Sequence, residues 1–137
     1  MDIGKLFRKD HSELIPYTPV LPPESLAKLG NVLEEAVIKL NANENPYGPS
    51  PKVQIALGNY NGYNIYPDPA QTKIRAVLAD YIGLPSEYIL AGAGADEIID
   101  LILRATIDPG DTVIDCPPTF GMYSFSTNVN GGKVISI

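Results

Sequence analysis

One glycine-rich segment of this 137-residue sequence has the residue types best suited to binding a ligand. Gly92-Ala93-Gly94-Ala95 follows the apolar run Tyr88–Ala91 and leads into an apolar-striped stretch over residues 95–105. Glycine lets the backbone turn tightly and approach a ligand closely. The unpaired N–H groups at the start of a helix attract anions. The segment therefore predicts a phosphate-binding loop, with an ordinary strand-to-helix turn as the alternative.

Two acidic residues, Asp96 and Glu97, follow this loop directly. Carboxylates also favour the positive end of a helix, where they would compete with a bound anion. If a phosphate binds here, we expect both carboxylates to point away from it.

A dinucleotide is the rival ligand for the same loop. Gly92 and Gly94 supply two of the three fingerprint glycines, and Asp115 lies about twenty residues on, where a ribose-binding acid would stand. Glu97 occupies the third glycine position and is too large for close helix–strand packing. The dinucleotide reading is weakened but stays open.

Composition limits the classes of partner. The net charge is −6, without a basic cluster, which argues against nucleic acid and anionic membrane surfaces as partners. Cys116 is the single cysteine, so no intrachain disulfide forms, and we expect a cytoplasmic protein. Cys116 is expected to be a small core residue and His11 a solvated one. Neither has partners at metal-ligand spacing, so no metal site is predicted.

The elements that position the glycine loop follow from periodicity and turn residues. Four prolines between Pro16 and Pro23 exclude helix and central strand there and predict an extended arm laid over a surface or a disordered leader. Ser50-Pro51 and Asp68-Pro69 are typical helix starts, and Gly83 a helix end. Further on, the sequence predicts strands at 37–41, 88–91, 112–116 and 133–137, and helices at 95–105 and 120–130. Strands alternating with helices indicate parallel βαβ units.

A series of motifs resembles the histidinol-phosphate aminotransferase family in order and spacing, from about Pro16 to Ile137. The motifs are Lys39-Leu40-Asn41-Ala42-Asn43-Glu44-Asn45-Pro46-Tyr47-Gly48-Pro49-Ser50-Pro51, Tyr66-Pro67-Asp68-Pro69, Gly94-Ala95-Asp96-Glu97, Asp108-Pro109-Gly110-Asp111 and Pro117-Pro118-Thr119-Phe120-Gly121-Met122-Tyr123. The resemblance implies an aspartate-aminotransferase-like α/β fold, pyridoxal 5′-phosphate as cofactor and a homodimer. It implies transamination of a small-molecule amino donor with a 2-oxo acid, first of all histidinol phosphate with 2-oxoglutarate in histidine biosynthesis.

The resemblance also assigns cofactor-binding residues. Backbone amides around Gly94, Ala95 and Asp96 would hold the cofactor phosphate, and Phe120 would stack on the pyridine ring. Many family members have tyrosine in place of Phe120, so the ring contact is kept and a hydroxyl is lost. Tyr66 would reach the phosphate of the other subunit. A structural turn, a core phenylalanine and an ordinary loop tyrosine are the respective alternatives.

Tyr17 and Asn45 match family positions near the substrate, on the N-terminal arm and on the loop that lines the pocket. Packing and turn formation explain these two residues almost as well. Asn43 and Glu44 are expected to shape the loop.

The family's Schiff-base lysine comes later, after a serine-rich segment, and none of the seven lysines here matches it. We therefore expect an N-terminal fragment without a catalytic residue, inactive and aggregation-prone by itself. The expected parts are an arm and leader (1–36), a small-domain segment (37–84) and the first βαβαβ of a truncated large domain (85–137).

Three alternatives remain at this point. A same-fold threonine-phosphate decarboxylase or aromatic aminotransferase would share most of these motifs. A non-catalytic module would bind phosphate or a dinucleotide through the Gly92–Gly94 loop. A remnant of a truncated gene would neither fold stably nor bind a ligand.

Overall fold

The computed structural model describes residues 3–9, 11 and 14–137, and the chain forms two compact units. One unit comprises Met1–Tyr17 with Asp68–Ile137, and the other comprises Thr18–Pro67. The predicted boundaries after residues 36 and 84 do not coincide with these units and remain predictions.

The unit formed by Thr18–Pro67 contains short helices joined by irregular segments. These are α1 (Pro23–Gly30), the 3-10 turn η3 (Glu34–Ala36) and α2 (Pro51–Asn59). The extended arm expected from Pro16 to Pro23 is wrong at its end, because Pro23 begins α1. Proline is tolerated at the first helical position, where no intrahelical donor is needed. Ser50 caps α2 as predicted, accepting a hydrogen bond from the Lys52 N–H at 3.3 Å.

The strand predicted at residues 37–41 is absent, and this segment is irregular. Ile38 and Leu40 are 84% and 87% exposed. An apolar run forms a strand only when another strand offers its backbone groups, and none lies beside this run in the described chain.

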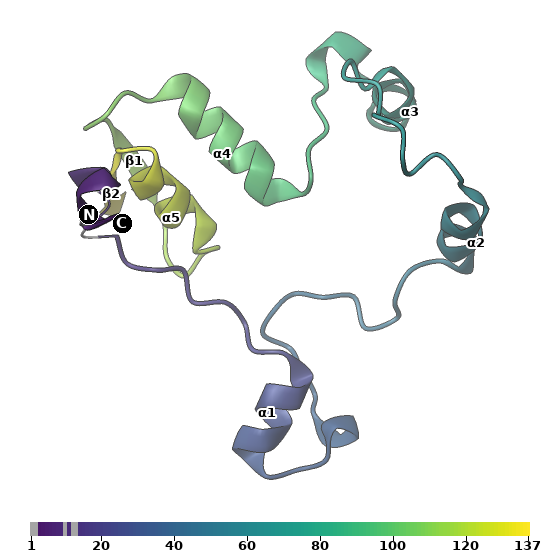
Figure 1. Cartoon of the computed structure of the whole chain (residues 1–137), viewed down its shortest axis with the longest axis horizontal. Coiled ribbons are helices and arrows are strands. Elements are labelled where there is room, and N and C mark those ends of the chain that lie inside the picture. Colours follow the sequence, from purple (N-terminus) through teal and green to yellow (C-terminus); the bar gives the residue numbers. More distant parts are fainter. Residues whose placement is uncertain (1–2, 10, 12–13) are drawn as a thin grey trace. The chain divides into compact units, whose positions relative to one another are not determined.

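The other unit contains the two-stranded sheet together with helices and short 3-10 turns. Its elements are η1 (Ile3–Leu6), α3 (Thr72–Ile82), η4 (Ser86–Tyr88), α4 (Ala95–Thr106), β1 (Thr112–Asp115), α5 (Met122–Val129) and β2 (Lys133–Ser136). The strands β1 and β2 pair in parallel, with Val113 opposite Val134 and Ile114 opposite Ile135. Helix α5 joins the strands and contacts both of them and α4 (Figure 1). The predicted parallel βαβ unit is confirmed.

The strand predicted at residues 88–91 is absent as well. Tyr88 ends the turn η4, and the backbone then runs extended from Ile89 without strand pairing. No other strand of the described chain lies against it. The glycine loop is therefore preceded by an extended segment instead of a strand.

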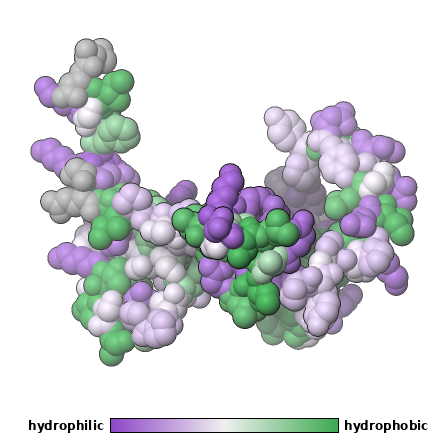
Figure 2. Space-filling view, turned by 90° about the horizontal axis from the view of Figure 1, so that it is seen from below, coloured by the Kyte–Doolittle hydropathy of each residue, from purple (hydrophilic) through white to green (hydrophobic). Residues whose placement is uncertain are grey.

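Few apolar side chains are buried. Among the described residues, only Ala27 and Leu103 are buried hydrophobic side chains, at 5% and 8% exposure. Thr127 is fully buried, and its hydroxyl donates to the Tyr123 carbonyl at 2.7 Å. Green apolar side chains reach the surface in many places in Figure 2. Exposed apolar surface of this extent is typical of faces that are covered by further protein.

Candidate functional site

The glycine loop has a backbone that glycine alone adopts readily. Gly94 is the N-cap of α4, with φ of 91° and ψ of 176°. Side chains are almost excluded from this conformation. The helix begins at Ala95, so the N–H groups of Ala95 and Asp96 have no acceptor within the helix. They lie at the positive end of the helix dipole, as a phosphate site requires.

The Glu97 carboxylate folds back onto the loop and accepts a hydrogen bond from the Ala93 N–H. A Cβ added to Gly92 would lie 2.9 Å from Glu97 Oε2 and 2.8 Å from Ile98 Cδ1. A side chain at position 92 would displace the ends of the Glu97 and Ile98 side chains, so Gly92 allows the loop to pack closely on the first turn of α4. Glu97 occupies one loop N–H and leaves those of Ala95 and Asp96. That Asp96 and Glu97 point away from a bound phosphate stays a prediction.

Phe120 lies in the connection between β1 and α5, beyond the carboxyl end of β1. The residue is 43% exposed, and its ring meets that of Tyr123 edge to face, with centroids 6.0 Å apart. Ligands of parallel α/β sheets bind beyond the carboxyl ends of strands. Phe120 thus keeps an aromatic surface open at such a position.

The N-terminal arm brings Tyr17 to the same turn. Its ring lies 6.3 Å from that of Phe125, and a Cβ on Gly121 would be 3.4 Å from Tyr17 Cε2. Since Gly121 follows Phe120 directly, the structure places Tyr17 beside the turn that carries Phe120. A substrate role for Tyr17 remains a prediction.

Arg8 and His11 attach the arm to the C-terminal end of α5. Arg8 Nη1 lies 3.4 Å from the Val129 carbonyl oxygen, and His11 Nε2 lies 3.2 Å from it. His11 is partly buried, so the expectation of a solvated histidine is wrong. Cations and N–H donors favour the negative end of a helix, which explains the contact.

Tyr66 and Asn45 belong to the other unit, so their placement near a cofactor or substrate stays a prediction. Tyr66 is 97% exposed. Asn45 Oδ1 accepts a hydrogen bond from the Tyr47 N–H at 3.0 Å, which closes a local turn. Glu44 accepts a hydrogen bond from Lys39 Nζ at 2.6 Å. Asn45 and Glu44 both shape their loop.

The remaining candidates offer little ligand chemistry. Cys116 is exposed, and the prediction of a core cysteine is wrong because β1 ends at Asp115.

An apolar cavity of about 180 Å³ lies among residues of α4, β1 and α5 and is lined by Ile99, Ile102, Leu103, Val113, Tyr123 and Thr127. Within the described residues, no cluster of His, Cys, Asp and Glu is suited to a metal ion. None of the described helices is long and apolar enough to cross a membrane.

Comparison with known proteins links this geometry to a family. The family model for class I and II aminotransferases matches residues 35–137. The chain is 50% identical over 98% of its length to histidinol-phosphate aminotransferase of Roseiflexus castenholzii, covering 38% of that protein. It is 54% identical over 98% of its length to the chloroplastic histidinol-phosphate aminotransferase of Nicotiana tabacum, covering 33% of that protein. The chain thus spans little more than a third of the length of such relatives.

A solved structure shares the fold. The crystal structure of histidinol-phosphate aminotransferase from Sinorhizobium meliloti, in complex with pyridoxal-5′-phosphate, superposes with a TM-score of 0.78. The match covers 96% of this chain and 34% of that chain, at 23% identity. The predicted aspartate-aminotransferase-like fold, present in part, is therefore confirmed.

Proposed function

The chain belongs to the class I and II aminotransferase family, and from this premise we propose that it is the N-terminal section of a pyridoxal-phosphate-dependent aminotransferase. The observation that carries the proposal is the identity of about half along almost the whole chain to relatives that share one enzyme name. The glycine loop at the start of α4 supports the cofactor part of the proposal.

The residues of the loop and of the Phe120 turn fit this cofactor. The N–H groups of Ala95 and Asp96 donate to phosphate oxygens, and Gly94 lets the backbone reach them. Phe120 offers its ring to the pyridine, which contributes about 0.5–1.5 kcal/mol beyond area burial. When bound, the cofactor supplies the carbonyl carbon that takes up the amino group and the ring that withdraws electrons. Tyr66 of a second copy donates its hydroxyl to the phosphate.

The proposed substrates are histidinol phosphate as amino donor and 2-oxoglutarate as acceptor. The names of the relatives support this choice, and so does the run from Asn43 to Gly48. Tyr17 and Asn45 contribute to the substrate pocket. A threonine-phosphate decarboxylase or an aromatic aminotransferase is the alternative within the same fold.

The test uses the complete protein that contains this chain, purified with pyridoxal phosphate. Absorbance above 400 nm would report cofactor binding, and the formation of glutamate from 2-oxoglutarate would report the reaction. We expect histidinol phosphate to be a far better donor than tyrosine or phenylalanine. Preference for an aromatic amino acid, or release of carbon dioxide from threonine phosphate, would contradict the proposed substrate.

We further propose that this chain does not transaminate by itself, because none of its lysines matches the family's cofactor lysine.

The complete protein is proposed to be a cytoplasmic homodimer. The lone Cys116 is consistent with a reducing compartment, although the Nicotiana tabacum relative is chloroplastic. Light scattering of the complete protein and cell fractionation test these two statements.

A further inference from the structure

The side-chain amide of Gln71 forms hydrogen bonds with the extended backbone segment that precedes the glycine loop. Gln71 Nε2 donates to the Ala91 carbonyl oxygen at 2.6 Å, and Gln71 Oε1 accepts from the Ala91 N–H at 3.1 Å. Both bonds are partly buried. One amide thus satisfies both backbone groups of Ala91, as a residue on a paired strand would.

The backbone of Gln71 has an unfavourable conformation. Its φ of 56° and ψ of 31° lie in the left-handed region, which disfavours residues other than glycine and asparagine. Gln71 is the N-cap of α3, but its side chain makes no capping hydrogen bond there. Asp68 supplies the cap instead, accepting from the Thr72 N–H at 2.9 Å. The amide of Gln71 is therefore committed to Ala91.

Helix α3 is also attached to the segment that leads to Ala91. Arg75 donates to the Ser86 carbonyl oxygen through Nε at 2.9 Å and Nη2 at 2.6 Å, and through Nη1 to the Ala70 carbonyl oxygen at 3.2 Å. Arg75 thus binds the Ser86 end of the segment from Ser86 to Ala91 to α3, and Gln71 binds the Ala91 end. Gln71 is consequently one of two α3 contacts that hold this segment.

The contact between Gln71 and Ala91 lies directly beside the glycine loop, because Ala91 immediately precedes Gly92. On the other side, the Glu97 carboxylate holds the Ala93 N–H. The loop is thereby held at Ala91 and at Ala93, the two neighbours of Gly92. The N–H groups proposed to bind phosphate follow directly.

We propose that Gln71 is a positioning residue for the phosphate-binding loop, acting through Ala91. This inference rests on the proposed function. Loss of the amide lets the backbone from Ala91 to Asp96 move, which weakens binding of the cofactor phosphate. The pyridine ring, held at the Phe120 turn, keeps its contacts.

The experiment compares the affinities of the complete protein for pyridoxal phosphate and for pyridoxal, which lacks the phosphate. Gln71→Met keeps the size of the side chain and removes both hydrogen bonds. We expect the pyridoxal phosphate dissociation constant to rise about tenfold, corresponding to about 1.4 kcal/mol. The pyridoxal dissociation constant should stay within about twofold.

Two further variants make the result specific. Gln71→Gly removes the amide but tolerates the left-handed backbone, so it should lose phosphate affinity even if Gln71→Met folds poorly. Gln54→Met is the matched control, since Gln54 lies exposed on α2. It should bind both compounds like the parent protein.

If the two dissociation constants rise equally in the Gln71 variants, or if neither changes, the positioning role is overturned and the proposed function stays intact. A parent protein that binds neither compound would overturn the proposed function and this inference together.

Discussion

Gly94 is the residue on which the proposed phosphate site most directly depends. A side chain at its φ of 91° and ψ of 176° is strained, at a cost of about 1–3 kcal/mol. A Cβ there would meet no atom within 4 Å, so the effect of Gly94→Ala comes from the backbone and not from a clash. We expect the complete protein with Gly94→Ala to bind pyridoxal phosphate at least tenfold more weakly, as measured by absorbance titration.

The control for this prediction is Gly110→Ala. Gly110 also has a positive φ, of 96°, and a Cβ there also meets nothing within 4 Å. Its backbone therefore also favours glycine, but the residue lies in the turn between α4 and β1. If Gly110→Ala weakens cofactor binding as much as Gly94→Ala does, the special role of the phosphate loop is wrong.

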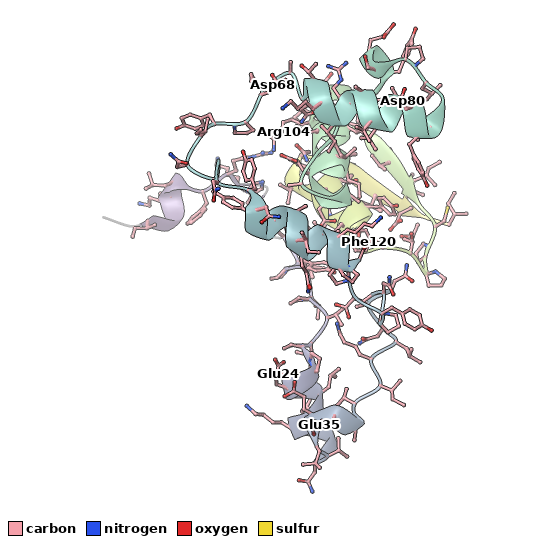
Figure 3. All side chains as sticks on the ribbon, turned by 90° about the vertical axis from the view of Figure 1, so that its right-hand side faces the viewer. Glu24, Glu35, Asp68, Asp80, Arg104 and Phe120 are labelled. Carbon is pink, nitrogen blue, oxygen red and sulfur yellow. The ribbon has the colours of Figure 1, made fainter. Side chains whose placement is uncertain are left out.

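Asp68 carries a charge that stabilises the start of α3 (Figure 3). Hydrogen bonds from the Thr72 side chain, the Thr72 N–H and the Ala70 N–H hold the pKa of the Asp68 carboxyl below its ordinary value. Because the folded pKa lies below the unfolded one, the stabilisation is fully present above the unfolded pKa. It is lost as the pH falls through the folded pKa.

We therefore expect the pKa of Asp68, followed by carbon-13 NMR titration of its carboxyl in the complete protein, to lie below that of an unfolded peptide. Thr72→Val should raise it, since this variant removes the first of the three donors. A normal pKa for Asp68 would show that the cap does not form in solution.

At the scale of elements, α4 and α5 are joined by one polar link. Asn130 Nδ2 donates to Asp100 Oδ1 at 2.8 Å and to the Ser126 carbonyl oxygen at 2.9 Å, and Asp100 also pairs with Arg104. The link is partly buried, so its loss leaves Asp100 with fewer partners.

We expect Asn130→Ala to lower the free energy of unfolding by about 1–2 kcal/mol, measured by urea denaturation of the complete protein. Asn128→Ala, at an exposed position of α5, should change it by no more than about 0.5 kcal/mol. Equal effects of the two variants would contradict a specific role of the link.

The elements that the sequence predicts correctly are those set by local signals. Ser50-Pro51 starts α2, and Gly83, with its φ of 74°, ends α3. The glycine loop at the start of α4 is equally local. Each depends on capping or on backbone freedom within a few residues, so the sequence alone is sufficient to find it.

The two predicted strands that are absent depend on partners distant in sequence, whereas the helix start predicted at Asp68-Pro69 is only displaced, to Thr72. The segments at 37–41 and 88–91 have apolar runs typical of strands, but a strand needs a neighbour that no local pattern provides. The role inferred for Gln71 was missed for the same reason, because its contact with Ala91 spans twenty residues and follows no periodicity. The predicted contributions of Tyr66 and Asn45 likewise depend on parts of the molecule that lie outside their own unit.

At the scale of the whole molecule, the sheet is covered on one face only by the described elements. Val113 and Val134 are half-buried, whereas Ile114 and Ile135, on the opposite face, are 63% and 53% exposed. Parallel sheets are normally covered on both faces. The apolar side of α4 also stays open in part, with Ile102 at 56% exposure.

We therefore expect this 137-residue chain, produced alone, to aggregate or to remain partly molten. Exposed apolar faces and unpaired strand edges promote association, and the few buried side chains give little cooperativity. The isolated chain should bind the dye ANS, show helical circular dichroism and unfold over a broad temperature range. The complete protein is the control and should unfold sharply, with little dye binding. A monomeric sample of the isolated chain with one sharp thermal transition would refute this prediction. That result would mean that the interior contacts around Leu103 and Thr127 are sufficient to hold the βαβ unit together without further chain.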